Sequence, residues 1–547
     1  MPFIPLLSFF FIAHLRQTRY NSKGLAGKHK KEEEIMTSQI CIILAIVAYL
    51  GLMIYIGIVF SKKNTQAAEF YLGGRKLGPL VTAMSAEASD MSSYLLMGLP
   101  GLAYISGLAE VGWTAIGLAI GTYLNWLLVS KRIRRYSSRI GSFTIPEFFS
   151  KRYGDDKHLL TCIAALIIVI FFVPYTASGF AACGKLFSTL FGMNYIVAML
   201  LSAAVIVLYC TLGGFLAVST TDLIQGITMS IALLIVVGFG AIVTGGFDSV
   251  MDSVSTLPGY LSLVQTYSPQ TNSAAPYTPL MIASMLAWGL GYFGMPHILL
   301  RFMAIEDENK LTLSRRIASV WVVISMSIAV LIGVVGYSLS QAGIIPVLEG
   351  SNSETVIIQI ASVLSSRGIL PALIAGVILA GILAATMSTA DSQLLAAASS
   401  ISQNLIQDFG KRKLDTKTSL RIARLTVIVI SVIAIFIAQD PDSSIFGIVS
   451  FAWAGFGAAF GPVVLLALFW RRSNKQGALA GMTAGGIMVF VWKYGIAKLG
   501  GAFAIYELLP AFVIALLVNV LVSLITKEPE DKLTRIFDEV NKNESHF

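Results

Sequence analysis

The chain has 547 residues, of which 56% are hydrophobic and 13% charged, and its formal net charge is +9 at pH 7. A soluble domain of this length cannot bury so large an apolar fraction, so the composition excludes a soluble protein and indicates a polytopic membrane protein. In a membrane protein, an excess of Lys and Arg reports loop topology more often than nucleic-acid binding.

The sequence lacks the motifs of several enzyme classes. No HExxH or other paired metal spacing, P-loop or nucleophile elbow occurs in the sequence. We therefore expect no enzymatic activity. We also expect small buried thiols and no disulfide framework, because all four cysteines lie in apolar segments: Cys41, Cys162, Cys183 and Cys210.

The first 35 residues do not resemble the rest of the chain. Their apolar run, Pro2 to Ala13, is too short to span a bilayer, and its positive charges follow the run, unlike those of a signal peptide. The lysine and glutamate codons just before Met36 can form a purine-rich ribosome-binding site. We expect residues 1–35 to be a non-native or disordered extension, with Met36 as the native start in a bacterium.

Thirteen apolar segments of about 18–25 residues follow Met36, each long enough to cross a bilayer. They predict one membrane domain over residues 36–526 and a charged cytoplasmic tail over residues 527–547. The approximate segments are 39–60, 78–103, 109–130, 158–182, 194–213, 224–245, 279–300, 317–340, 371–397, 422–439, 445–470, 476–496 and 504–526.

Loop charges give the expected orientation. After Met36, Lys and Arg gather on alternate loops, and the opposite loops carry four: Lys185, Arg367, Lys493 and Lys498. By the positive-inside rule, the N-terminus lies outside and the C-terminus lies in the cytoplasm. The long loop 245–278 has no Lys or Arg and is therefore expected outside.

The second segment is interrupted by polar residues. Between Ser85 and Gly101 it holds two carboxylates, Glu87 and Asp90, four serines and a Gly-x-Pro-Gly break. Lipid does not tolerate such groups unless they face protein, ions or water. Transporters use interrupted spans to expose backbone carbonyls to a cation. The alternative is a kinked helix whose serines bond to its own carbonyls.

Three other residues have either a structural or a functional interpretation. In the fourth segment, Tyr175 either faces a cavity or packs beside Pro174, and packing is slightly favoured. Asp222, placed at the cytoplasmic start of the sixth segment, is either a helix N-cap or a gating residue. Arg75, before the second segment, is most simply a topology charge.

The seventh segment carries an aromatic stripe. Trp288, Tyr292 and Pro296 are spaced i, i+4, i+8, so they share one helical face. An aromatic stripe is more often packing than a binding site. The proline and the interspersed glycines nevertheless predict a second broken helix.

The ninth segment offers oxygen ligands. Ala385, Ser388 and Thr389 share a helical face, and hydroxyl and carbonyl oxygens suit sodium, which is a hard cation. The alternative is that both hydroxyls bond to carbonyls of their own helix. Segments 2–6 and 7–11 are each five helices that begin with an interrupted one, which predicts an inverted repeat with a site at its interface.

Three motifs together resemble the sodium/solute symporter family, with the sodium/proline carriers as the nearest branch: 89–92 with 95–101, 288–294 with 296–297, and 387–389 with 393–395. The resemblance covers about residues 39–526. It implies an all-α polytopic membrane protein with a LeuT-like 5+5 inverted-repeat core, one extra helix before it and two after.

The resemblance also implies site residues. Sodium would be bound by the carbonyls of Ala88, Met91 and Ala385 and by the hydroxyls of Ser388 and Thr389. Asp90 would supply the carboxylate for sodium coupling, and Asp222 and Arg75 would serve gating or ion access. Proline would lie near Ser92, Tyr175, Trp288, Tyr292 and Pro296.

The chain departs from the proline carriers beside these motifs. Glu87 replaces a small residue, Ser93-Tyr94 replaces Gly-Trp, Met295 replaces Gln, and Asp391 adds a carboxylate. Because the sodium motif is intact, the ion is better defined than the substrate.

The expected function is sodium-coupled import of L-proline by alternating access in the bacterial plasma membrane. The expected partners are sodium, proline and the lipid bilayer, with no nucleic acid and no obligate protein partner. The alternatives are a symporter for another small amino acid or carboxylate, or a non-transporting sensor or a channel.

Overall fold

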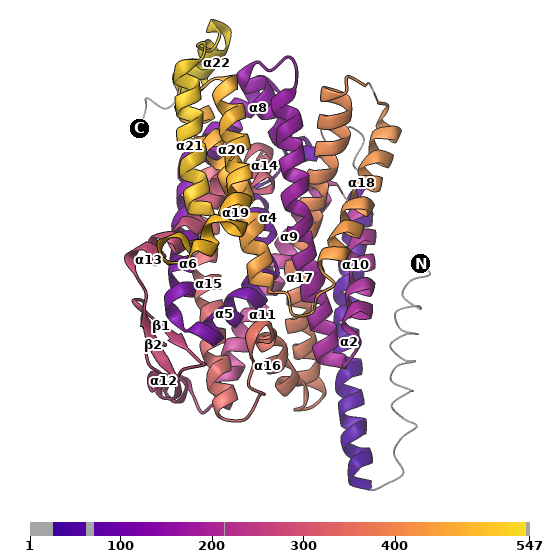
Figure 1. Cartoon of the computed structure of the whole chain (residues 1–547). Helices are drawn as coiled ribbons and strands as arrows, with labels where there is room; N and C mark the ends of the chain where they lie inside the picture. Colours follow the sequence, from indigo (N-terminus) through magenta and orange to yellow (C-terminus); the bar gives the residue numbers. More distant parts are fainter. Residues whose placement is uncertain (1–25, 62–70, 213, 413, 543–547) are drawn as a thin grey trace.

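The computed structural model describes residues 26–61, 71–212, 214–412 and 414–542. Most of these residues form helices that stand side by side as an upright bundle (Figure 1). The main helices are α2 (Ala26–Ser61), α4 (Pro79–Ser93), α5 (Leu99–Ser106), α6 (Leu108–Leu124), α7 (Ser130–Ile140), α8 (Ile145–Tyr153), α9 (Leu159–Phe191), α10 (Tyr195–Leu212), α11 (Phe215–Val243), α12 (Phe247–Ser255), α13 (Pro279–Leu286), α14 (Pro296–Ala304), α15 (Leu311–Gln341), α16 (Val356–Ser365), α17 (Ile369–Ser399), α18 (Thr416–Ile437), α19 (Ile445–Phe469), α20 (Lys475–Tyr494), α21 (Leu508–Ile525) and α22 (Asp531–Lys542).

The apolar segments predicted from the sequence coincide with these helices. Each of the thirteen falls on a helix or on a broken helical run, such as α4 followed by α5. Among the described residues, nine helices are long and apolar enough to cross a membrane, and the bent pair α13–α14 makes a tenth. The crossing count of thirteen stays a prediction.

The two ends of the bundle carry different short elements. One end holds α8 and α22, and the other holds α12, α16 and the antiparallel hairpin β1 (Gln265–Ser268) with β2 (Ser273–Pro276) (Figure 1). This hairpin and α12 belong to the loop that carries no Lys or Arg. The two ends therefore separate the cation-poor loop from the cation-rich ones.

The N-terminal extension is described only from residue 26. Residues 1–25 lie outside the described part of the chain, whereas 26–35 form the first turns of α2. The expectation that residues 1–35 are a non-native or disordered extension stays a prediction, although residues 26–35 continue the helix. Whether Met36 is the native start stays a prediction.

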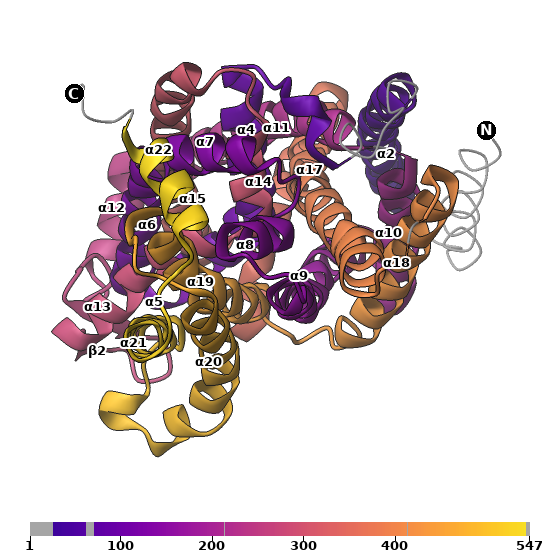
Figure 2. The ribbon, with the colours of Figure 1, turned by 90° about the horizontal axis from the view of Figure 1, so that it is seen from above.

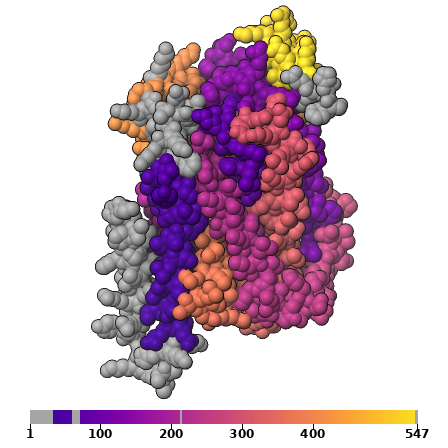
Figure 3. Space-filling model, turned by 180° about the vertical axis from the view of Figure 1, so that it is seen from behind, coloured from indigo at the N-terminus to yellow at the C-terminus, as the bar shows by residue number. Residues whose placement is uncertain are grey.

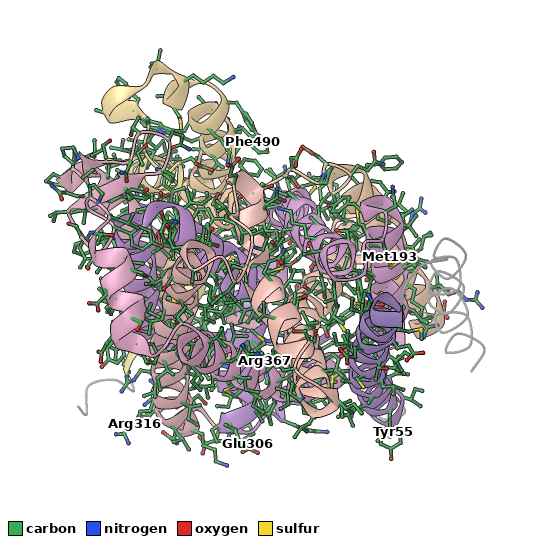
Figure 4. All side chains as sticks on the ribbon, turned by 90° about the horizontal axis from the view of Figure 1, so that it is seen from below. Tyr55, Met193, Glu306, Arg316, Arg367 and Phe490 are labelled. Carbon is green, nitrogen blue, oxygen red and sulfur yellow. The ribbon has the colours of Figure 1, made fainter. Side chains whose placement is uncertain are left out.

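The flanks of the bundle are apolar. In the space-filling view, α2 stands as a column along one edge (Figure 3). Tyr55 on α2 points outward at the edge of the bundle (Figure 4), with an exposed fraction of 66%, and Phe490 on α20 is 39% exposed. Large apolar side chains exposed along a helical bundle are those expected to face lipid.

The charged tail is partly folded. Its helix α22 lies across the end of the bundle beside α7 (Figure 2). Phe537 and Val540 are buried on one face of α22, and on the other side Glu539 pairs with Arg139 at 2.7 Å. The tail is therefore docked on the bundle through an amphipathic helix.

Long central helices surround the interrupted ones. α17 packs against α4, α9 and α11, and α19 packs against the segment between α13 and α14. The two breaks are thus buried between these helices.

Candidate functional site

The first break lies at Ser92. Its backbone torsions are φ 46° and ψ −166°, outside the helical region. A π-helical turn, Tyr94–Gly98, follows, in which the Leu99 amide donates to the Tyr94 carbonyl. The sequence placed the break at the Gly-x-Pro-Gly motif, which is wrong. The wide turn accommodates Pro100, which has no amide hydrogen, so the helix continues there.

The second break separates α13 from α14, which are bent by 48°. Between them lie a 3₁₀ segment, η5 (Ala287–Gly294), and Met295 in extended conformation. Gly289 packs directly on Gly117 and Gly121 of α6: a Cβ on Gly121 would overlap the Gly289 backbone, and a Cβ on Gly289 would overlap the Gly117 carbonyl. The predicted second broken helix is confirmed, and its glycines allow this close approach.

Oxygen atoms converge where α4 meets α17. The Ser388 hydroxyl lies 2.8 Å from the Ala88 carbonyl and 3.2 Å from the Ala385 carbonyl. The Thr389 hydroxyl donates to the same Ala385 carbonyl at 3.1 Å. Four of the five expected sodium ligands are thus joined. The fifth, the Met91 carbonyl, accepts the amide of Tyr94 beside the break.

The sequence allowed two interpretations of Ser388 and Thr389, as oxygen ligands for sodium or as hydroxyls bonded within their own helix, and the structure has features of both. Ser388 and Thr389 do bond to a carbonyl of their own helix, as the alternative held. Ser388 also reaches across to α4, which a self-bonded hydroxyl would not do.

Two tyrosines hold Asp90. The Tyr292 hydroxyl donates to Asp90 Oδ2 at 2.7 Å, and the Tyr175 hydroxyl donates to the Asp90 carbonyl at 3.0 Å. The slight preference for packing of Tyr175 is wrong, because its hydroxyl faces the broken helix. Tyr292 joins the two interrupted helices directly.

A small cavity lies next to the oxygen cluster. Its volume is about 10 Å³, room for one water molecule at most, so the structure is closed around it. Ser92 and Tyr175 line it together with Thr176, Thr389 and Gln393. A larger groove of about 530 Å³ lies between α11 and α15 and has an almost wholly apolar lining, away from both breaks.

The remaining expected substrate residues do not line this cavity. Trp288 stacks on Tyr94 and Tyr506, with ring centroids 5.4 and 5.0 Å apart. Pro296 is the first residue of α14, where its fixed φ suits a helix start. The structure thus separates the expected substrate residues: Ser92 and Tyr175 line the cavity, Trp288 lies in an aromatic cluster, and Tyr292 and Pro296 lie at the second break.

A buried charge cluster joins four helices. Arg301 on α14 bonds to Asp222 on α11 at 3.1 Å, to Ser85 on α4 at 3.0 Å and to Ser392 on α17 at 2.5 Å. Asp222 is fully buried. We call Arg301, Asp222, Ser85 and Ser392 the Arg301 cluster.

The N-cap reading of Asp222 is wrong. α11 begins at Phe215, nine residues before the predicted segment, and its N-cap is Gly214. Asp222 therefore lies two turns inside the helix. Arg301, counted as a loop charge from the sequence, lies inside α14; an arginine within an apolar run was the signal that could have found it.

Arg75 is more than a topology charge. Its guanidinium donates to the Ser137 hydroxyl and to the carbonyls of Met303 and Ser142. Burial, together with the nearby Arg134, lowers the pKa of Arg75 to about 10, so it stays protonated at pH 7. Arg75 thus ties the segment before α4 to α7 and α14.

A second buried ion pair lies at the other end of the bundle. Lys185 on α9 pairs with Glu354 at 2.8 Å and donates to the Ser443 carbonyl. Glu354 also accepts the amides of Ile445 and Phe446 at the start of α19, which favours a negative charge there. Sequence reasoning counted Lys185 only as a loop charge.

The residues expected from the sequence to differ from the proline carriers are all buried. Glu87 accepts a hydrogen bond from Trp126 Nε1 at 2.9 Å, and Tyr94 belongs to the aromatic cluster. Asp391 lies next to Ser392 of the Arg301 cluster. In the part of the chain that the structure describes, no group of three or more His, Cys, Asp or Glu is placed to hold a metal ion.

Comparison with known proteins agrees with this geometry. A model of the sodium:solute symporter family matches residues 70–485. An osmoregulated proline transporter of Bacillus subtilis is 41% identical over 504 residues, covering 92% of this chain and 98% of its own. Sodium/proline symporters of Haemophilus influenzae and Escherichia coli are 41% and 39% identical, over 90% of this chain and 96% and 95% of theirs.

A solved structure shares the fold. A Na⁺-coupled sialic acid symporter in a substrate-bound, outward-open state superposes with a TM-score of 0.72 at 18% identity. The alignment covers 90% of this chain and 99% of that one.

Proposed function

Because this chain belongs to the sodium:solute symporter family, we propose that it imports proline together with sodium across the plasma membrane of a bacterium. The observation that carries the proposal is the contact between the broken helix α4 and α17. There, hydroxyl and carbonyl oxygens converge without a basic side chain among them, which suits a hard monovalent cation.

In this proposal the carbonyls of Ala88, Met91 and Ala385 and the hydroxyls of Ser388 and Thr389 bind sodium. When the ion is present, these groups turn from one another toward it. Sodium thereby holds α4 against α17, and proline binding is linked to sodium binding by the same free energy in both directions.

Proline is proposed to bind between the two breaks. Ser92 and Tyr175 line the small cavity beside the first break, and Trp288, Tyr292 and Pro296 lie on η5 and at the start of α14, at the second break. The cavity has to widen before proline fits, and the rings stacked around Trp288 are the groups that would separate. The names of the relatives in three bacteria support proline as the solute.

Two buried ion pairs would act as the gates of alternating access. The Arg301 cluster joins α4, α11, α14 and α17 toward the end of the bundle that carries α8 and α22. The Lys185–Glu354 pair joins α9 to α19 at the opposite end. With the N-terminus outside, the first would be the cytoplasmic gate and the second the external gate, and Arg75 would support the cytoplasmic one.

The driving force is sufficient. One charge that crosses 100 mV contributes about 2.3 kcal/mol, and a tenfold sodium gradient adds about 1.4 kcal/mol. Even one sodium per solute therefore supports an accumulation of roughly 500-fold.

The test is uptake of labelled proline by the full chain reconstituted in liposomes. We expect concentrative uptake with an inward sodium gradient and none with an equal potassium gradient. Unlabelled proline should compete, whereas other amino acids, pantothenate and sugars should not. Sodium-driven uptake of a different solute would overturn proline and retain the coupling ion; uptake that never exceeds the driving gradient would indicate a channel.

A further inference from the structure

Four buried oxygen atoms without a hydrogen-bond partner gather on one side of α4. Two are carboxylate oxygens, Oε2 of Glu87 and Oδ1 of Asp90, and the others are Oγ1 of Thr122 and Oδ1 of Asn125. All four side chains are buried, with exposed fractions of 5% or less. A buried polar atom without a partner costs about 1–3 kcal/mol, and more when it is charged. Four together therefore call for a ligand.

Helix geometry brings these atoms together. Glu87 and Asp90 are spaced i, i+3 on α4 and so share a face. Thr122 and Asn125 lie where α6 passes into the π-helical turn η4 (Asn125–Val129). Just before this turn, Gly121 of α6 packs on Gly289 of η5. The Tyr292 hydroxyl touches Asp90, and the Tyr292 carbonyl accepts a hydrogen bond from Asn125 at 3.0 Å.

The orientation of Asn125 is fixed by its partner. A carbonyl only accepts, so the atom 3.0 Å from the Tyr292 carbonyl must be the amide nitrogen. Asn125 Oδ1 is therefore left without a donor. The Glu87 carboxylate is also only half satisfied. Trp126 Nε1 donates to Oε1, and Oε2 has no partner.

The cluster lacks a positive charge. No Lys, Arg or His within the described ranges pairs with Glu87 or Asp90. Their side chains bond to neutral donors, Trp126 Nε1 on Glu87 and the Tyr292 hydroxyl on Asp90. Two buried carboxylates close together do not both stay ionised without a cation. A shared proton would satisfy two of the four oxygens, whereas a hard metal ion takes all four as ligands.

We propose that Glu87, Asp90, Thr122 and Asn125 form a second sodium site between α4, the end of α6 and η5. This inference rests on the proposed function, since it takes the ion that the family carries. The site is distinct from the Ala88–Ser388 cluster, which faces α17 and includes no carboxylate side chain. The two ions would lie on opposite sides of the broken helix α4. Both breaks would therefore be fixed in place only when both sodium sites are occupied.

Glu87 is the residue that distinguishes this site. It supplies the second carboxylate beside Asp90, and its Oε2 has no partner among the described residues. Glu87→Gln removes the charge and keeps an acceptor for Trp126, so it separates an ion-binding role from a packing role. Glu110→Gln is a matched control, because Glu110 is a partly buried carboxylate on α6 outside the cluster.

The first test counts bound sodium without any solute. The purified full chain is equilibrated with ²²Na⁺, and the ions bound per chain are measured at saturation. We expect two in the unaltered chain, one in Glu87→Gln and two in Glu110→Gln. One ion in the unaltered chain, or equal binding by the unaltered chain and Glu87→Gln, would overturn the second site.

The second test measures coupling. At zero membrane potential, a tenfold sodium gradient should accumulate the solute about a hundredfold if two ions move with it, and about tenfold in Glu87→Gln. Accumulation driven by a pH gradient at equal sodium would overturn a sodium site in favour of a proton site. If proline is not transported at all, the proposed function fails while the sodium count still decides the second site.

Discussion

The hydroxyl of Ser388 on α17 lies 2.8 Å from the carbonyl of Ala88 on α4, and the two residues are 300 positions apart in the sequence. This hydrogen bond connects the broken helix of the first half of the chain to an unbroken helix of the second half. A cation that binds between them has ligands from both halves. Its binding therefore reports on how the halves are arranged.

Replacing Ser388 by Ala should weaken sodium activation. The Ala88 carbonyl loses its partner and sodium loses one ligand, which corresponds to about 1–3 kcal/mol. We expect the sodium concentration for half-maximal uptake to rise about tenfold or more, as measured at saturating proline. Ser399→Ala is the matched control, because the Ser399 hydroxyl bonds only within α17. Normal transport by Ser388→Ala at low sodium would contradict the proposed sodium site.

Replacing Trp288 by Ala should affect the solute more than the ion. Trp288 stacks on Tyr94 and Tyr506 and lines none of the oxygen cluster. We expect the KM for proline to rise at least about tenfold, which is about 1.4 kcal/mol, with little change in sodium activation. Uptake kinetics at varied proline and fixed sodium give the answer. The control is Trp492→Ala, because Trp492 is partly buried on α20 and bonds to the Phe503 carbonyl. It should leave both unchanged, and an equal effect of Trp288→Ala on sodium and proline would argue against a solute-binding role.

Breaking the Arg301–Asp222 pair should destabilise the protein. Asp222→Ala leaves a buried guanidinium without its carboxylate, at a cost of roughly 3–5 kcal/mol. We expect a clear fall in thermal stability in detergent for Asp222→Ala and for Arg301→Met. The double variant should be more stable than either single variant, because it removes both charges. Additive losses would show that the two residues do not act as a pair.

Weakening the Lys185–Glu354 pair should open the end of the bundle that we propose to be the external gate. Glu354→Gln keeps acceptor capacity toward α19 but removes the charge that Lys185 faces. In a chain without native cysteines, we expect a cysteine at position 176, which lines the small cavity, to react several-fold faster with an impermeant reagent added outside. The exposed pair Lys310–Glu306 supplies the control through Glu306→Gln. Faster labelling from the cytoplasmic side alone would reverse the proposed orientation of the gates.

The sequence by itself determined the membrane class, the order of the helices and the presence of two interrupted ones. These properties follow from local chemistry: runs of apolar residues set the helices, and the glycines and proline near Trp288 permit a break. The motif around Ser388 and Thr389 was recognisable for the same reason, since a shared helical face follows from spacing alone.

Only the tertiary structure decided which polar groups meet. The break at Ser92, the pairing of Asp222 with Arg301 and the unpaired oxygens near Glu87 depend on helices that are far apart in the sequence. A buried charge or hydroxyl is satisfied by whichever helix packs against it, and a single segment does not specify that neighbour. Residue spacing along a helix thus predicts which side chains share a face, whereas the packing of helices decides which groups that face contacts.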